Sequence, residues 1–154
     1  MTKPIVKAAQ VPLSQEAAYE LFVGKMGLWW PLHSRSVSAH RDGARALGLE
    51  VNAVNDGKIT EITADGTRYI WGSFKDCDAP HSVEIAFHMG QPAEGASQLV
   101  VSFLPLGDEE CRVKLHHSGW ESYGELAQMM RDGYEVAWGE IFDEGYVQAC
   151  LGKN

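Results

Sequence analysis

The chain has 154 residues, of which 45% are hydrophobic and 22% are charged, an ordinary composition for a globular protein. Its net charge of −8 argues against nucleic acid and membrane partners, because phosphate groups are bound by clustered lysine and arginine. This length predicts one domain over residues 1–154 that needs no disulfide or metal. There is no apolar run long enough to span a bilayer, and we expect no signal peptide. The odd number of cysteines indicates free thiols. We therefore expect a cytoplasmic protein.

The first predicted elements are a strand and a capped helix. Ile5–Val11 is a strand candidate that ends before a proline. Ser14 occupies the N-cap position of a helix over about 14–25, whose apolar residues recur at helical spacing. The segment LWWPLHS at 28–34 predicts a short second helix or a tight loop that breaks at Pro31.

From residue 46 onwards the hydrophobic period changes to that of a strand. Apolar and polar residues alternate in short runs, separated by turn signals such as Asn55-Asp56-Gly57 and Asp65-Gly66. The predicted strands cover 47–53, 58–63, 67–75, 83–89, 99–103 and 113–117. Short connections between successive strands favour an antiparallel meander of about six or seven strands.

The last segment, Glu121–Leu151, predicts one long helix. Its broad apolar stripe, flanked by Tyr134, Trp138 and Tyr146, consists of Leu126, Met129, Met130, Ala137, Ile141 and Phe142. Each of its four glycines costs about 1 kcal/mol relative to alanine, which indicates close backbone approach or a break near Asp132-Gly133. The order of elements predicts an α+β fold in which the sheet curves around this helix.

Several local motifs indicate a protein family through the order in which they occur, although each motif alone is weak. They are VPLSQEAAYELF at 11–22, the pair Trp29-Trp30, GKITEI at 57–62 followed by Tyr69-Ile70-Trp71, LHHSGW at 115–120 and EVAWGEIF at 135–142. In this order they resemble the START-like (SRPBCC, helix-grip) superfamily, and within it the homologues of the activator of heat-shock-protein-90 ATPase. The resemblance covers nearly the whole chain, although Arg41–Arg45 replaces a Gly-Gly-x-Phe element of the family.

The resemblance implies a helix-grip fold with two short helices after the first strand and a cavity between the sheet and the C-terminal helix. The eukaryotic co-chaperone has an additional N-terminal domain, which we expect this chain to lack, so a chaperone interaction ranks behind ligand binding. A homodimer through sheet-edge pairing is compatible with the pattern but is not required by it.

Aromatic and methionine side chains on the predicted inner faces are the candidate ligand contacts. They are Trp29, Trp30, Trp71, Phe87, Phe103, His117, Met130, Trp138 and Phe142. Apolar ligand pockets have volumes of about 300–1,000 Å³ and are lined by such groups, and methionine repacks easily around variable ligands. An ordinary packed core is the alternative explanation for the same residues.

Among the polar residues, His117 is the candidate acid or base. His116 and His117 are adjacent on a strand, so their side chains point to opposite faces, and alternation directs His117 inward. A structural hydrogen bond to Ser118 or to the C-terminal helix is the alternative role for this imidazole. A zinc site from His117 with Cys111 or His88 lacks a recognisable ligand spacing, and we expect no metal and no cofactor.

Arginines after the tryptophan pair are candidate rim groups. Arg35 and Arg41 are placed to reach a ligand carboxylate, which a guanidinium binds with two parallel hydrogen bonds. We therefore predict that the protein binds an apolar or aromatic small molecule. The alternatives are a cyclase- or aromatase-like enzyme that uses the same cavity, with His117 moving protons, and a protein-interaction module related to chaperone ATPase activation.

Overall fold

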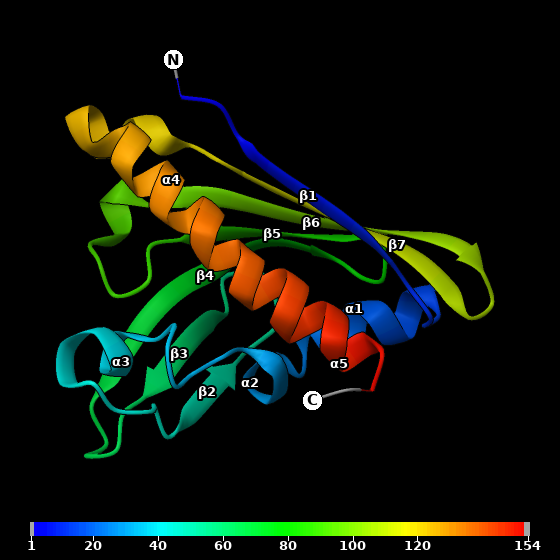
Figure 1. Cartoon of the computed structure of the whole chain (residues 1–154), viewed down its shortest axis with the longest axis horizontal. Helices are drawn as coiled ribbons and strands as arrows, with labels where there is room; N and C mark the ends of the chain where they lie inside the picture. The colour runs from blue at the N-terminus through cyan, green and yellow to red at the C-terminus, as the bar shows by residue number, and fades with distance from the viewer. Residues whose placement is uncertain (1, 153–154) are drawn as a thin grey trace.

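The computed structural model describes residues 2–152 and places a long C-terminal helix diagonally across a curved antiparallel sheet (Figure 1). The sheet has seven strands in the order β1-β7-β6-β5-β4-β3-β2. Their bounds are β1 Ile5–Val11, β2 Gly48–Val51, β3 Lys58–Ile62, β4 Arg68–Asp78, β5 Ser82–Phe87, β6 Ser97–Gly107 and β7 Glu110–Ser118. The predicted helix-grip architecture is therefore confirmed, with β1 added to the meander beside β7.

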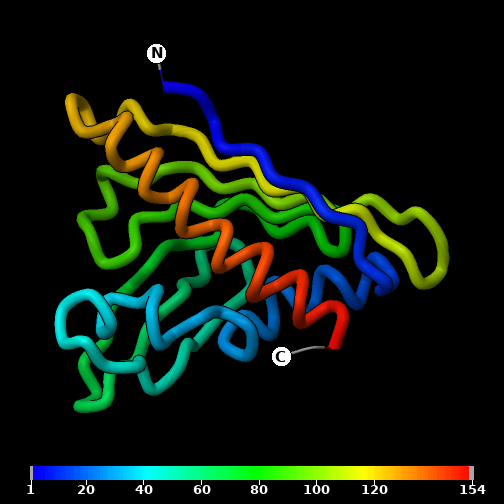
Figure 2. The backbone as a smooth tube through the Cα atoms, viewed as in Figure 1, coloured from blue at the N-terminus to red at the C-terminus, as the bar shows by residue number. Residues whose placement is uncertain are grey.

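Three short helices connect β1 to β2, namely α1 (Gln15–Val23), α2 (Met26–Trp29) and α3 (Val37–Asp42). The C-terminal part contains a 3-10 stretch, η2 (Trp120–Leu126), then α4 (Ala127–Trp138), a π-helical stretch, η3 (Gly139–Val147), and α5 (Gln148–Cys150). The last three form one continuous rod in Figure 2, which we call the closing helix. A further 3-10 turn, η1 (Ala93–Gly95), lies between β5 and β6.

Local chemistry fixes the starts of α1 and α3. The Ser14 hydroxyl accepts a hydrogen bond from the Ala17 amide at 3.1 Å, as the sequence predicted for an N-cap. Ser36 caps α3 in the same way, through the Ala39 amide at 3.0 Å, and Gly43 ends that helix with a φ of 61°. Helix α3 was not among the predicted elements, although a serine seven residues before a glycine is the signal that marks it.

Bulges in three strand pairs bend the sheet around the closing helix. The register shifts between Ile59 and Thr60, between Phe74 and Asp76, and between Pro105 and Gly107. An extra residue in one strand of a pair increases the local twist and bends that strand. The concave face holds the core, which α1 and α2 close near the C-terminal end of the closing helix (Figure 1).

The closing helix differs from the sequence-based expectations in three respects. Regular α-helix begins at Ala127 rather than at Glu121, because Gly124 has a non-helical conformation (φ 58°, ψ −125°). No break occurs at Gly133, which lies within α4. The apolar stripe is also rotated from the predicted one, since Leu126 and Met129 are exposed while Trp138 is fully buried.

Close backbone approach, the other explanation offered for the glycines, applies at Gly145. A methyl group added there would lie 2.8 Å from the Trp29 carbonyl oxygen, whereas one added at Gly133 or Gly139 would meet no atom within 4 Å. Gly145 therefore lets the π-helical stretch lie directly against α2. Within residues 2–152, no helix is long and apolar enough to cross a membrane.

Candidate functional site

Most of the predicted contact residues pack against one another. Trp30, Trp71, Phe87 and Trp138, which we call the aromatic layer, lie between the sheet and the closing helix and are all buried. Trp30 is central, with its ring centroid 4.9 Å from that of Trp71 and 5.8 Å from that of Trp138. Offset and edge-on contacts at such distances stabilise a core beyond the burial of area alone. The aromatic layer thus fills the middle of the grip.

The remaining predicted residues lie around this layer. Trp29 contacts Trp30 at 5.7 Å, and Phe142 stacks on Tyr146 at 5.8 Å. Phe103 lies apart, against rings of α1. All three predicted residues are buried, whereas Met130 is only partly buried and faces open space.

His117 is inward, as predicted, and both of its ring nitrogens have partners. The Trp138 indole donates to Nδ1 at 3.0 Å, and Nε2 lies 2.7 Å from the Ser97 hydroxyl. Because an indole N–H can only donate, the network assigns the proton of the neutral imidazole to Nε2, which donates to Ser97. Burial, reinforced by His116, lowers the pKa of His117 to about 3. This histidine is therefore neutral at physiological pH and links β7, β6 and the closing helix.

A pocket of about 300 Å³ opens beside the aromatic layer. We call it the methionine pocket, after the three methionines in its wall. One wall is the closing helix, and the other comes from α3, the segment before it and the turn that follows β5. Its lining residues are Arg35, His40, His88, Met89, Gln91, Met129, Met130, Gly133, Tyr134, Ala137 and Ile141. The predicted contact Met130 and the predicted rim arginine, Arg35, both line this pocket, whereas Arg41 lies outside it.

The wall around Arg35 is built from both sides of the pocket. The Trp30 indole donates to the Arg35 carbonyl oxygen at 2.7 Å, so the aromatic layer fixes this segment. The Arg35 Nε donates to Glu140 of the closing helix at 2.9 Å, and the Ser34 hydroxyl donates to the other carboxylate oxygen. The hydrogen bond from Ser34, together with Arg35, lowers the pKa of the Glu140 carboxyl below its usual value. Glu140 is therefore an anion that orients Arg35.

Glu61 holds α3 in place and was missed as a structural residue. Its carboxylate is fully buried and accepts hydrogen bonds from the Val37 amide at 2.8 Å and the Ser38 amide at 2.9 Å. The Trp71 indole donates to the same carboxylate at 2.9 Å. A negative group at the first turn of a helix satisfies amides that have no partner within the helix. Glu61 thereby joins α3, which carries His40, to the aromatic layer.

The pocket wall has two further polar groups, His88, which is buried, and Tyr134, which is partly buried. His88 is 7% exposed, and its Nδ1 has no hydrogen-bond partner among the described residues. Tyr134 lies on the closing helix and lines the pocket. Burial raises the pKa of its hydroxyl well above its usual value. Tyr134 is therefore a neutral phenol at physiological pH.

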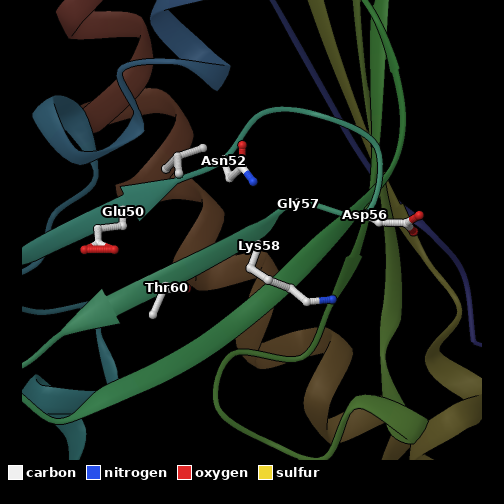
Figure 3. Close-up of a pocket in the computed structure, with 7 residues that line it drawn as sticks. Glu50, Asn52, Asp56, Gly57, Lys58 and Thr60 are labelled. Atoms are coloured by element: carbon white, nitrogen blue, oxygen red, sulfur yellow. The ribbon is translucent and has the colours of Figure 1, made fainter.

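A second hollow, of about 340 Å³, lies on the β2–β3 hairpin and differs in chemistry (Figure 3). Its wall contains Glu50, Asn52, Asp56 and Lys58, and Figure 3 shows Glu50 and Lys58 on neighbouring strands. Glu50 is already paired with Arg68 through two hydrogen bonds of 2.9 and 3.0 Å. None of the predicted contact residues lines this polar, open surface, so the methionine pocket is the better candidate site.

Within residues 2–152, no group of three or more His, Cys, Asp or Glu side chains is arranged to hold a metal ion. The thiols also lack the environment of reactive cysteines, since burial raises the pKa of Cys77, Cys111 and Cys150. The chemistry of the candidate site therefore rests on its arginine, histidines, glutamine and phenol.

The family comparison agrees with this architecture. The family described as activator of Hsp90 ATPase homolog 1-like protein matches residues 14–144, from the start of α1 into the π-helical stretch. This protein belongs to that family. The resemblance inferred from the motifs is thus confirmed, and the matched residues of this Hsp90-activator-like chain include every wall of the methionine pocket. No curated protein sequence matches the chain significantly.

Solved structures share the fold at low sequence identity. The self-sacrificing resistance protein CalC from Micromonospora echinospora is 20% identical, with a TM-score of 0.65 over 98% of this chain and 93% of that one. An Hsp90 activator from Plasmodium falciparum is 17% identical, with a TM-score of 0.62 over 97% of this chain and 96% of that one. An anthrahydroquino-γ-pyrone synthase is 24% identical, with a TM-score of 0.60 over 86% of this chain and 87% of that one. These likenesses establish the START-like fold of this family member.

Proposed function

We propose that this protein binds an apolar or aromatic small molecule in the methionine pocket. The observation that carries the proposal is the pocket itself, about 300 Å³ between the closing helix and the α3 side, at the lower end of the usual volumes of ligand sites. Three methionines line it, and Met129 is 62% exposed. An apolar wall with a few convergent polar groups is the usual composition of a small-molecule site.

The fold neighbours support the proposal in one respect. The anthrahydroquino-γ-pyrone synthase is described as complexed with SUM, so a domain of this fold is known in complex with another molecule. The aromatic layer contributes indirectly, because the Trp30 indole donates to the Arg35 carbonyl oxygen and the Trp71 indole donates to Glu61, the carboxylate that holds α3. The predicted ligand contacts that lie in this layer, and the cyclase-like and chaperone-related alternatives, stay predictions.

The test uses a steric block at a glycine of the closing helix. Gly133 lines the pocket and has open space around it, so a Gly133→Leu side chain extends into the volume a ligand needs. Titration with the neutral dye N-phenyl-naphthylamine should show saturable fluorescence enhancement for the wild type and at least about tenfold weaker binding for Gly133→Leu.

Gly139→Leu is the matched control, because Gly139 lies in the same helix and is unobstructed but does not line the pocket. This variant should bind the dye like the wild type, and both variants should retain the wild-type melting temperature within a few degrees. Equal binding by all three proteins would place the dye elsewhere and overturn the proposal, as would the absence of binding to the wild type.

A further inference from the structure

The charged side chain that lines the methionine pocket is opposite in sign to the net charge of the chain. The sequence has 21 acidic and 13 basic residues, yet the described lining contains one arginine, Arg35, and no carboxylate. The other polar lining groups are His40, His88, Gln91 and Tyr134. An apolar pocket whose charged wall residue is a guanidinium favours a ligand with negative charge at one end.

Arg35 is held in a manner that leaves part of its guanidinium available. Its backbone is fixed by Trp30 and its Nε by Glu140. Among the described residues, neither Nη nitrogen of Arg35 has a hydrogen-bond partner. A guanidinium presents its donors in a planar fork that fits the two oxygens of a carboxylate. Pairing through Nε alone therefore orients the fork and leaves the Nη nitrogens for a second acceptor.

Glu140 determines whether Arg35 attracts an anion at long range or only through short hydrogen bonds. Its negative charge lies 2.9 Å from Arg35 and cancels most of the field of the guanidinium beyond a few ångströms. Long-range attraction of an anion to a chain of net charge −8 is therefore weak, and any preference for an anion comes from short hydrogen bonds to the fork. Such binding depends little on salt.

We infer that the ligand of the methionine pocket is an acid with an apolar body. Its carboxylate or similar oxyanion pairs with the Nη nitrogens of Arg35, near His40 and Gln91, and its body lies along Met130, Tyr134 and Ala137. The inference rests on the proposed function, since it gives the chemical class of the molecule bound in the same pocket.

The experiment compares two dyes with the same body. Anilinonaphthalene sulfonate carries an oxyanion that N-phenyl-naphthylamine lacks, so the ratio of their dissociation constants isolates the acidic group. Arg35→Gln should weaken the sulfonate about ten- to a hundredfold relative to the neutral dye, the range expected for a lost charged hydrogen bond. Arg35→Lys, which keeps the charge without the fork, should give an intermediate ratio.

Arg41→Gln is the matched control, because Arg41 lies nearby in α3 but donates to the Tyr69 hydroxyl at 2.8 Å outside the pocket. This variant should leave the ratio unchanged, as should raising the salt concentration with the wild type. Displacement of the neutral dye by naphthoic acid but not by naphthamide should extend the result to carboxylates. Circular dichroism and melting curves show that each variant is folded.

The outcomes separate the two proposals. If the neutral dye binds and the Arg35 variants change both dyes equally, or neither, the acidic-ligand inference is wrong and the proposed function stands. If neither dye nor naphthoic acid binds the folded wild type, both proposals fail.

Discussion

Two neighbouring stripes of the closing helix differ in their surroundings: one packs in the core, and the other lines the methionine pocket. Trp138, Phe142 and Tyr146 are fully buried against rings of the sheet and the N-terminal helices. Met130 and Ala137, on the adjoining stripe, line the methionine pocket. The difference lies in what faces each stripe. Large rings from β4, β5 and α2 meet the first, whereas the second faces polar groups and the chain around α3. A helix of this kind fills space only where the opposite surface supplies matching volume.

The largest expected effect comes from comparing one truncated side chain on each stripe. Trp138→Ala removes a fully buried indole and leaves His117 Nδ1 without its donor, so the free energy of unfolding should fall by about 3–5 kcal/mol. Met129→Ala, at an exposed position of the pocket wall, should change it by less than about 0.5 kcal/mol. Urea denaturation measures both values, and similar losses for the two variants would show that the stripes do not differ.

A second test uses the pH dependence of the buried stripe. The pKa of His117 falls from its ordinary value of 6.5 to about 3 on folding, so between these pH values the unfolded chain binds a proton that the folded chain does not. Stability from this group is complete above pH 6.5 and is lost as the pH falls toward 3, with a slope of about 1.4 kcal/mol per pH unit.

The slope is measured by urea denaturation between about pH 6 and about pH 4, against the His117→Gln variant, in which the carboxylates titrate as before. The free energy of unfolding of the wild type should fall more steeply with decreasing pH than that of the variant, by about 1.4 kcal/mol per pH unit, the contribution of one proton. Equal slopes would mean that His117 is protonated in the folded protein. His116→Gln, at the outward neighbour, should retain the steep wild-type slope.

The smallest expected effects compare two glycines of the closing helix. Gly145→Ala forces a methyl group to 2.8 Å from the Trp29 carbonyl oxygen and should destabilise the protein by about 1–3 kcal/mol. Gly139→Ala meets open space at a residue with right-handed helical dihedral angles (φ −58°, ψ −42°) and should stabilise the protein by about 0.5–1 kcal/mol. Melting temperatures should therefore move in opposite directions. A shift of the same sign in both would remove close packing as the reason for Gly145.

Much of the fold was predictable because its signals are local. Alternation gave the strands to within a few residues, and β1 was predicted with the bounds that the structure shows. Ser14 and the Asn55-Asp56-Gly57 turn were recognised from side-chain chemistry that acts over three or four residues. The rotation of the apolar stripe was missed because burial of Trp138 rather than Met129 depends on partners more than fifteen residues away in the chain.

The candidate site was less predictable for the same reason. Arg35 and Met130 were named from the pattern, but their convergence depends on α3, which lies about ninety residues from the closing helix in sequence. Glu61 was recognised only as part of the GKITEI motif, since nothing in a strand pattern distinguishes a carboxylate that contacts the start of a helix. The capping signal of Ser36, which marks α3, was the available clue to this wall.

Through Glu61, the Trp71 indole reports on the position of α3. One carboxylate receives the first amides of α3 and the indole N–H of Trp71, so any shift of α3 changes the electronic surroundings of that indole. The ¹⁵N-indole resonance of Trp71 thus registers movement of a segment that it does not itself belong to. Binding of the proposed ligand should therefore shift this single NMR cross-peak if it displaces α3, and the ligand itself needs no label.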